Sequence, residues 1–591
     1  LTINNTFGSI NLSNSVSVSG AFTLTNGILT IGANSLTLGG TASRTNGFFA
    51  GGITSSLTAN AAAGTLFFDG TGTNNYLKAF TIGASGSATL GNALNITAYD
   101  GVSAEGVLTV TSGGTLTTGG FLTIKSDANG TGRIAAGNTA GGYISGNATV
   151  ERFIPQNSSK GWRLLASNTS GQTINAAWQE GQADASSNTS PGFGTQISSG
   201  NALGYSLATA QSNGFDALST GVGLFKYNPA TDGLDPVTNT NSTALASEHG
   251  YFIFIRGDRS SGGHYGAGAP TTSTVLRSTG TVFQGDQSAV STGAQNYGLV
   301  RNPYPSRIDM RQIVRSGSLV DAYQVWDPKL GGAFGVGAYQ TFTKSGSDYI
   351  VTPGLGSYGA NGSVQNFIES GTAFFIQSSG GSGSAQVVEA AKTSGSSVVN
   401  RPAAPQAGEA KFAYNLYANN NGSFDAVDGG LTFFADEYSN LVDANDVRKS
   451  TNFNENFGTK RSNIDLVVER KKNINVTDTI FFSMSQLRQI GYRLDIEMAN
   501  IDPLITTAFL EDKYTNTSTA LDLTASNAYN YTVDANAASR AADRFKVVFR
   551  QSTVVPVSFV SIKAAQQGSR IAVEWNVANE INIARYEIEK S

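Results

Sequence analysis

The sequence predicts an all-β fold, in which an N-terminal parallel β-helix, or β-solenoid, is followed by several β-sandwich-like domains in an elongated array. Three observations support this prediction. Short apolar stretches alternate with polar residues at a period of two, which is the pattern of β-strands. The chain has 70 glycines, and Asn-Gly pairs supply turns between the stretches. A chain of 591 residues is also long enough to divide into several domains, each with its own core.

Residues 1–150 are predicted to form the β-solenoid. Apolar stretches begin six residues apart at positions 10, 16, 22 and 28. The sequence of residues 27–40 recurs in similar form at residues 106–120. One coil cannot bury its apolar side chains alone, whereas stacked coils share a continuous narrow core. A plain antiparallel β-sandwich is the alternative for this region.

Charged residues are scarce in the first 150 positions. Parallel β-helices also house polysaccharide lyases and hydrolases, which cluster acidic and basic side chains on one face. Here the charges are scattered between turns, which favours a spacer or adhesive role over an active cleft. The eight charged residues are Arg44, Asp69, Lys78, Asp100, Glu105, Lys125, Asp127 and Arg133.

Residues 151–400 are predicted to form a duplicated β domain, with copies at about 151–290 and 291–400. Three strand-like segments of the first copy return in the same order in the second, with loops of different length. The segments are 162–167, 224–229 and 250–257 in the first copy, and 297–306, 322–328 and 370–376 in the second.

A third domain, a β-sandwich, is predicted at residues 409–552. The Gly/Ser-rich run 378–384 and the stretch 401–405, Arg-Pro-Ala-Ala-Pro, bracket the expected boundary before it. Eight alternating runs with polar turns fit two packed sheets. These runs are 411–417, 430–434, 464–469, 479–483, 492–497, 508–513, 529–533 and 544–549.

Two pairs of aspartates are the candidate metal ligands. Carboxylates of this kind could bind calcium, the one cofactor considered for this chain. Neither pair matches the D-x-[DN]-x-[DN]-G loop, and ordinary Asx turns are the alternative explanation. The four residues are Asp425, Asp428, Asp443 and Asp446.

Three tryptophans are candidates for stacking on a glycan, namely Trp162, Trp178 and Trp326. Within alternating strands, tryptophans are more often part of the core, and this is the alternative. The string Asn302-Pro-Tyr-Pro-Ser306 is predicted to be a packed corner, because its two prolines stiffen the turn.

Several chemistries are not expected. The chain has no cysteine, which excludes disulfides and thiol chemistry, and its net charge of -4 gives no field that would attract nucleic acid. Its only histidines, His249 and His264, lack a G-x-S-x-G partner. No apolar run approaches the length of about 18 residues that crosses a bilayer, so no transmembrane segment is expected. We therefore expect a protein that is not an enzyme, although a glycosidase carboxylate pair could be hidden in the sheets.

The C-terminal stretch 554–591 closely resembles a module found near the C-terminus of Bacteroidetes-type secreted surface proteins. The residues that fall on its pattern are Pro556, Trp575, Glu580, Asn582, Glu587 and Ser591. The resemblance implies export by the type IX secretion route and a location outside the cell, on the bacterial surface. In such proteins a sorting domain normally lies further downstream, so the export signal itself is inferred. The stretch is expected to be the start of an immunoglobulin-like module, incomplete in this chain.

Other segments are similar to the same surface proteins. The strings R-F-I-P, W-R-L-L, G-Y-x-x-F-x-R-G-x-R and N-P-Y-P-S recur in them, and all four occur here, the third with Arg256 and Arg259. The segment 443–449 also matches the sandwich that precedes their tail module. The resemblance implies a location outside the cell and an arrangement of domains, but it does not identify a ligand.

The expected function is that of an extracellular structural or adhesive surface protein. Its expected partner is another copy of itself or a neighbouring surface protein. A specific version is a filament formed by strand or end-to-end complementation, because exposed sheet edges and open solenoid ends recruit partners. The alternative for the two ends is that the chain is a fragment of a longer protein. The alternative function is a glycan-binding or glycan-cleaving surface protein.

Overall fold

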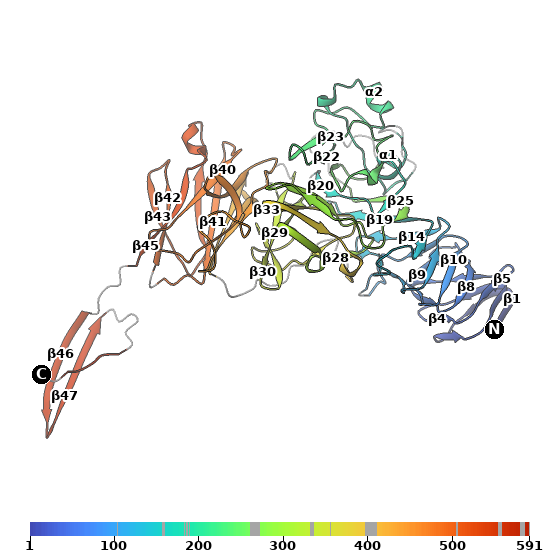
Figure 1. Ribbon diagram of the computed structural model, residues 1–591, viewed down its shortest axis with the longest axis horizontal. Helices are drawn as coiled ribbons and strands as arrows, with labels where there is room; N and C mark the ends of the chain where they lie inside the picture. The colour runs from blue at the N-terminus through green and yellow to red at the C-terminus, as the bar shows by residue number, and fades with distance from the viewer. Residues whose placement is uncertain are drawn as a thin grey trace.

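The computed structural model confirms an all-β chain that runs from an N-terminal solenoid at one end to a C-terminal hairpin at the other (Figure 1). The described parts contain only two α-helices, α1 (Ile174–Trp178) and α2 (Leu207–Ser212). The structure describes residues 1–102, 104–156, 160–182, 184, 187, 190–259, 272–330, 336–354, 356–395, 410–503, 506–552, 558–578 and 585–589.

The first 150 residues form the predicted solenoid, because their strands pair in parallel from coil to coil. The strands form three sheets, of which one is β1-β3-β5, a second is β8-β10-β13-β18, with β8 against β5, and the third begins β2-β4-β7-β9-β11-β14-β19. The inward side chains of the three sheets share one core, in which Leu24, Leu36, Leu57 and Phe80 are buried. The main strands are β1 (Thr2–Asn11), β2 (Val16–Val18), β3 (Phe22–Thr30), β4 (Ser35–Leu38), β5 (Ala42–Arg44), β7 (Gly52–Ala59), β8 (Ala62–Leu66), β9 (Tyr76–Ile82), β10 (Ser87–Leu90), β11 (Leu94–Ile96), β12 (Val107–Val110), β13 (Thr115–Thr117), β14 (Leu122–Ile124), β18 (Ile144–Ser145) and β19 (Asn147–Ile154).

The six-residue spacing seen in the sequence separates strands within a coil and is not the length of a coil. Near the N-terminus, a hydrogen bond between neighbouring coils joins Ser35 to Ser15, 20 residues earlier. Further along, the equivalent contact joins Ser145 to Thr117, 28 residues earlier. The coils therefore lengthen along the solenoid.

The solenoid continues into the next domain without a break. Strand β19 pairs in parallel with β14 of the last coil and antiparallel with β25 (Thr274–Val282) of the following domain. One sheet thus crosses the boundary predicted at residue 150. An ion pair adds to this connection, since Lys125 of the solenoid contacts Glu151 of β19 at 2.5 Å.

Residues 151–400 contain two sheets with the same strand order, which supports the predicted duplication. The first copy has the order β20-β24-β22-β23, and the corresponding strands of the second copy pair as β27-β33-β29-β30. The strands are β20 (Gly161–Leu165), β22 (Leu224–Asn228), β23 (Gly233–Pro236), β24 (Tyr251–Ile255), β26 (Val290–Thr292), β27 (Tyr297–Arg301), β29 (Val314–Asp327), β30 (Ala338–Ser345), β31 (Asp348–Thr352) and β33 (Ala373–Gln386).

The two copies pack against each other through corresponding faces. Leu164 and Phe252 of the first copy lie in one buried cluster with Leu299, Trp326 and Phe375 of the second. In Figure 1 the rest of the first copy, with α1 and α2, projects to one side of the long axis.

The region 409–552, predicted to be a sandwich of two sheets, contains all eight expected strands, which join into one continuous sheet. Its sheet has the order β43-β42-β45-β40-β38-β39-β36-β35-β41-β44 and encloses a core that includes Phe412, Phe482 and Phe545. The outer face of β35 and β36 packs on the second copy, where Phe433 joins Val320 in one cluster. The strands are β35 (Ala410–Asn420), β36 (Ser423–Phe434), β37 (Val447–Arg448), β38 (Asn456–Arg461), β39 (Ile464–Lys471), β40 (Thr479–Ser485), β41 (Gly491–Ala499), β42 (Thr506–Asp512), β43 (Thr517–Leu521), β44 (Asn527–Thr532) and β45 (Phe545–Gln551).

The Gly/Ser-rich run 378–384, one of the two stretches that bracket the expected boundary, belongs to a long strand of the second copy. It lies inside β33, where Ser384 pairs with Ser316 of β29 and with Ser291 of β26. The neighbouring backbone explains the glycine at 383, because a Cβ there would lie 2.8 Å from the amide nitrogen of Leu319. The second predicted boundary marker, residues 401–405, lies outside the described residues.

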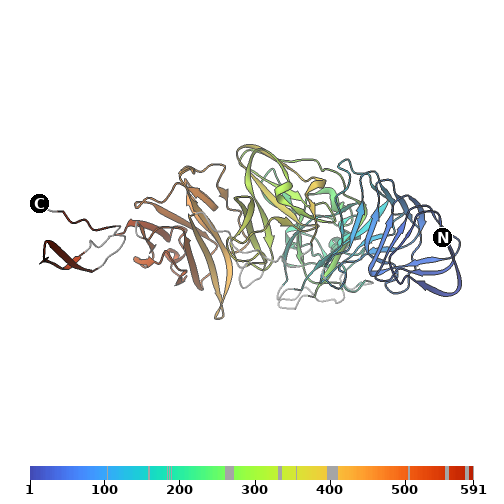
Figure 2. The ribbon, with the colours of Figure 1, turned by 90° about the horizontal axis from the view of Figure 1, so that it is seen from below.

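The tail forms a hairpin of β46 (Ser558–Gln567) and β47 (Arg570–Ala578), which pair only with each other among the described strands. About three strands were expected from the sequence. Trp575 packs on Tyr586 with ring centroids 5.6 Å apart. Pro556, Glu580, Asn582 and Ser591 of the tail pattern lie outside the described residues. Figure 2 shows the hairpin set apart from the sandwich along the long axis.

Candidate functional site

Trp178 and Trp326 are core residues, so the prediction of a glycan platform is wrong for these two tryptophans. Trp178, in α1, is 4% exposed and packs on Tyr251, and Trp326, in β29, is 5% exposed and packs on Phe252. Neither presents an open ring face to a sugar. Trp162, in β20, is half-buried between aromatic neighbours, with the ring of Phe254 at 5.2 Å.

The four aspartates do not converge on one site. Asp425 lies on β36 and accepts a hydrogen bond from Asn420 at 3.3 Å. Asp428, on the same strand, is buried, and its carboxylate contacts the Lys449 ammonium at 2.6 Å. Burial raises the pKa of Asp428, and the adjacent Lys449 opposes the shift.

Asp443 and Asp446 belong to a turn that a basic side chain stabilises. Asp446 is buried, forms an ion pair with Arg461, and accepts a hydrogen bond from the amide of Asp443 at 2.9 Å. Burial raises the pKa of Asp446, and the amide of Arg470 and the Arg461 guanidinium oppose the shift. In the parts of the chain that are described, no three acidic or histidine residues are placed to hold a metal ion. The geometry therefore favours internal ion pairs over the predicted calcium site at Asp428 and Asp446.

The string 302–306 forms a packed corner, as predicted. The side-chain amide of Asn302 donates to the carbonyl oxygens of Ser306 and Ile368 at 2.9 and 3.1 Å. Tyr304 is fully buried and donates its hydroxyl to the carbonyl of Gly285 at 2.7 Å. These contacts fix the backbone after β27, and they leave the tyrosine hydroxyl engaged inside the core.

Arg259, the last arginine of the third recurring string, has a structural role. Its guanidinium is fully buried and contacts the carboxylate of Asp216 at 2.6 Å. It also donates to the carbonyl oxygen of Thr195 at 3.2 Å. Because a buried charge is costly without partners, this arrangement stabilises the loops of the first copy only as a complete set.

A buried group of charged and aromatic side chains joins the solenoid to the second copy, and we call it the Glu389 latch. Tyr143 of the solenoid donates its hydroxyl to the carboxylate of Glu389 at 2.8 Å, and Lys392 contacts the same carboxylate at 2.8 Å. The Lys392 ammonium also lies 4.4 Å from the centre of the Tyr304 ring. Burial lowers the pKa of Lys392 to about 8, although Glu389 opposes the shift.

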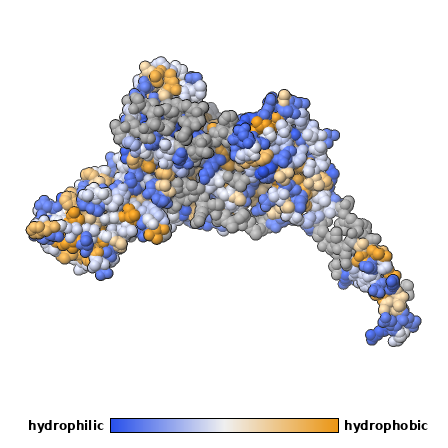
Figure 3. All heavy atoms as spheres, turned by 180° about the vertical axis from the view of Figure 1, so that it is seen from behind, coloured by the Kyte–Doolittle hydropathy of each residue, from blue (hydrophilic) through white to orange (hydrophobic). Residues whose placement is uncertain are grey.

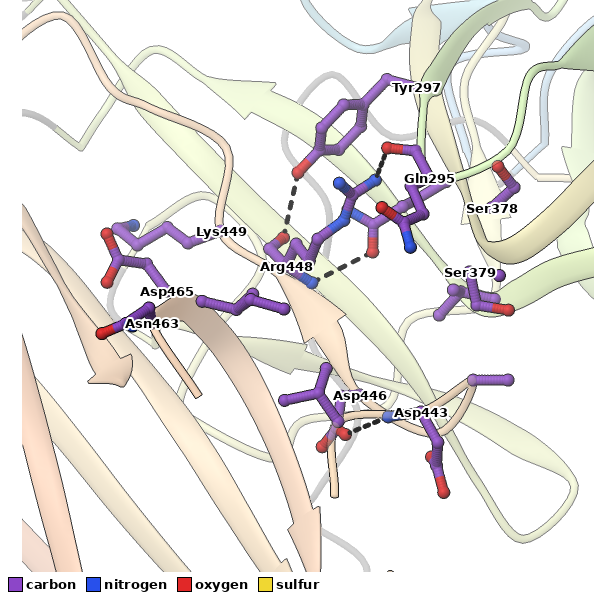
Figure 4. Close-up of a pocket in the computed structure, with 16 residues that line it drawn as sticks. Gln295, Tyr297, Ser378, Ser379, Asp443, Asp446, Arg448, Lys449, Asn463 and Asp465 are labelled. Atoms are coloured by element: carbon purple, nitrogen blue, oxygen red, sulfur yellow. Dashed lines mark hydrogen bonds between the residues drawn. The ribbon is translucent and has the colours of Figure 1, made fainter. Parts of the chain in front are cut away.

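A hollow of about 680 Å³ lies where the second copy meets the sandwich, and we call it the junction hollow. Figure 4 shows side chains of both domains around an open centre. One wall comes from β33 and the loop before β27, and the other comes from the segment around β37 and the turn before β39. Its polar and charged lining residues are Gln295, Tyr297, Gln377, Ser378, Ser379, Asp443, Asp446, Arg448, Lys449, Asn463 and Asp465.

Arg448 ties the two walls of the junction hollow together. Its backbone amide donates to Gln377 at 3.0 Å, and its carbonyl oxygen accepts a hydrogen bond from the Tyr297 hydroxyl at 3.3 Å. Its guanidinium bonds to the carbonyl of Gln295 and lies 5.4 Å from the centre of the Tyr297 ring. These contacts hold the guanidinium beside the tyrosine, at the edge of the open space (Figure 4).

A second, smaller hollow of about 210 Å³ adjoins the first, and we call it the aromatic hollow. The two hollows share Tyr297 and Lys449 as lining residues. Asp232 lies at its edge and accepts a hydrogen bond from the Tyr227 hydroxyl at 2.8 Å. Burial raises the pKa of Asp232. The five rings that line this hollow are those of Tyr227, Tyr297, Tyr339, Phe375 and Phe453.

Sequence reasoning did not find either hollow. Tyr297 and the segment 443–449 were noticed as parts of recurring strings, yet nothing in the sequence indicates that they meet across a domain junction.

Of the two histidines, His249 precedes β24 and His264 lies outside the described residues. None of the helices in the described ranges has the length and apolar character of a membrane span.

One comparison with known proteins identifies a family. No curated protein and no solved structure matches the chain. A family model described as a domain of unknown function, DUF8693, matches residues 205–549, which is more than half of the sequence. The match contains every residue that lines the two hollows. The chain therefore belongs to the DUF8693 family.

Proposed function

We propose that this protein is an extracellular structural or adhesive component of the bacterial surface, exported by the type IX route, and that it is not an enzyme. Its role would depend on its length and its contact surfaces. The observation that carries the proposal is the continuity of the β structure: the solenoid sheet extends through β19 into β25, and buried clusters join the later domains. Such a body can hold a contact surface away from the cell and transmit load along its axis.

The resemblance of the tail and the use of the charged residues support the same proposal. Many charges of the described residues are used internally, as in the solenoid ion pairs Lys78–Asp100 and Arg133–Glu105. Solubility then depends mainly on uncharged polar residues, as the composition indicates. A protein with little net charge and a polar surface is suited to contact with other surfaces, because no long-range repulsion of one sign dominates.

We propose self-association as one form of this role. Among the described strands, β1 pairs with β3 along one edge only. Phe7, on that strand, is 98% exposed. Figure 3 shows hydrophobic side chains at the surface of the solenoid and of the tail hairpin. Open strand edges with exposed apolar side chains recruit further strands, which supports assembly through this end.

Surface labelling in the native host tests the proposal. Intact cells are treated with a protease that cannot enter them, and the chain is detected with an antibody in the parent strain and in a strain lacking type IX secretion. We expect the protease to cleave the chain on parent cells, and we expect the chain to stay inside cells of the secretion mutant. Deletion of the gene should weaken the attachment of cells to surfaces or alter the structure of the cell surface. Protection of the chain in both strains would contradict an extracellular role.

A further inference from the structure

We propose that the junction hollow and the aromatic hollow together bind a short neutral oligosaccharide. This inference goes beyond the structural role, since a rod could serve that role without any small ligand. It rests on the size of the two hollows, on the types of side chain that line them, and on the balance of their charges.

The dimensions fit a small ligand. The junction hollow, at about 680 Å³, lies within the range of about 300–1,000 Å³ that is typical of ligand pockets, and pockets of this kind favour domain junctions. The adjoining aromatic hollow adds about 210 Å³. Because Tyr297 lines both, a ligand longer than one ring could lie across this residue with one end in each hollow.

The two hollows offer the two kinds of contact that a sugar needs. A pyranose ring has apolar C–H faces, which pack on the electron-rich faces of aromatic rings, and hydroxyl groups, which exchange hydrogen bonds with amides and carboxylates. Five aromatic rings line the smaller hollow, with the Asp232 carboxylate at its edge. The larger hollow supplies the amides of Gln295 and Asn463, the carboxylate of Asp443 and the guanidinium of Arg448.

The charges favour a neutral ligand over an anion or a cation. Asp446 is paired with Arg461, and Lys449 is paired with Asp428, so these four charges compensate one another. Of the other charged lining residues, Asp465 pairs with Lys460 at 3.6 Å, while Asp443, Asp232 and Arg448 bring charges of both signs. The lining therefore has no wall of a single charge that would select an anion or a cation. A polyhydroxylated neutral molecule can donate to the carboxylate and accept from the guanidinium without a net electrostatic cost.

Ala444 gives a test that leaves the ion pairs in place. This residue is exposed and lines the junction hollow, so Ala444→Trp fills the space without removing a native contact. The matched control is Ala535→Trp, at another exposed alanine in a loop after β44. A second pair removes one amide: Gln295→Ala at the hollow, and Gln567→Ala in the exposed tail hairpin as its control.

The full chain and the four variants are applied to a printed array of neutral di- to hexasaccharides with their sialylated and sulfated counterparts. We expect wild-type binding to neutral oligosaccharides, weakened about tenfold or more by Ala444→Trp and measurably by Gln295→Ala, with both controls unchanged. If Ala444→Trp lowers the melting temperature, Gln295→Ala decides the result. The proposal would be overturned if the wild type bound none of the neutral sugars or preferred their charged counterparts. It would also be overturned if both hollow variants bound the sugars as well as the wild type does.

Discussion

Buried polar side chains in this protein join segments that are far apart in the sequence. Glu389 connects the solenoid to the second copy, Arg259 holds the loops of the first copy, and Arg544 forms a buried ion pair with Asp512 at 2.8 Å. Burial opposes ionisation of Asp512, but the hydrogen bonds and charge of Arg544 outweigh it and lower the pKa of Asp512. Such groups specify which segments meet, because a wrong partner would leave a charge unpaired in the interior.

The Glu389 latch predicts a dependence of stability on pH. The pKa of Lys392 in the folded chain is about 8, below its ordinary value of 10.5. Between these two values the unfolded state binds more protons than the folded state, so the free energy of unfolding rises with pH. The full gain is on the order of 3 kcal/mol, since each pH unit of difference is worth about 1.4 kcal/mol. Denaturant unfolding at intervals from pH 7 to pH 10.5 measures this gain.

Lys392→Met is the matched variant, because methionine keeps the apolar stem and removes the titrating group. We expect the wild type to gain stability relative to this variant as the pH rises above 8. Parallel pH profiles for the two proteins would show that Lys392 does not titrate with a lowered pKa.

Strand alternation was the most dependable signal in the sequence. The runs 22–24, 36–38 and 492–497 all lie on strands that bury one face, because period-two alternation directly encodes two faces of a sheet. The length of a coil was not visible in the sequence, because it depends on which strands pair, and the six-residue spacing gives only the distance between strands within a coil. The Gly/Ser run 378–384 carried a second meaning that was not visible in the sequence, because close strand packing within β33 also requires small residues.

The candidate site could be predicted only in part. A tryptophan is suited both to stacking on a sugar and to packing in a core, and the low exposure of Trp178 and Trp326 shows that both belong to the core. Asp428 and Asp446 were recognised as notable acidic residues, but their partners Lys449 and Arg461 could not be assigned without the fold. Tyr297 and Arg448 meet across 151 residues of sequence, a contact that local patterns do not encode.

The open edge of β1 predicts how the chain would assemble. Replacing the exposed Phe7 by lysine places a charge on this edge, and charged side chains on an edge strand oppose pairing with another strand. We expect Phe7→Lys to shift the chain from oligomers to monomers, as measured by mass photometry over a range of concentrations.

Phe481→Lys is the control for this assembly prediction. Phe481 is also exposed, at 54%, but it lies on β40, which has strands on both sides in the sandwich. Its replacement should leave the oligomers unchanged. Dispersed monomers of the wild type at every concentration would contradict assembly through β1.

The molecule as a whole is a series of β modules that share sheets or buried interfaces. From β1 to β45, each module contacts the next through paired strands or an apolar cluster, as in β19–β25 and the cluster of Phe433 and Val320. Interfaces of this kind resist bending, because a hinge would have to expose apolar side chains and break strand pairs. The resulting elongated shape is the basis of the proposed structural role.

Small-angle X-ray scattering of the full chain in dilute solution tests this account most directly. The account predicts a distance distribution skewed towards long distances, and a scattering curve that one rigid, elongated body for residues 1–552 reproduces, with the tail hairpin attached. A compact, near-spherical particle, or the profile of domains that move independently on flexible linkers, would contradict it.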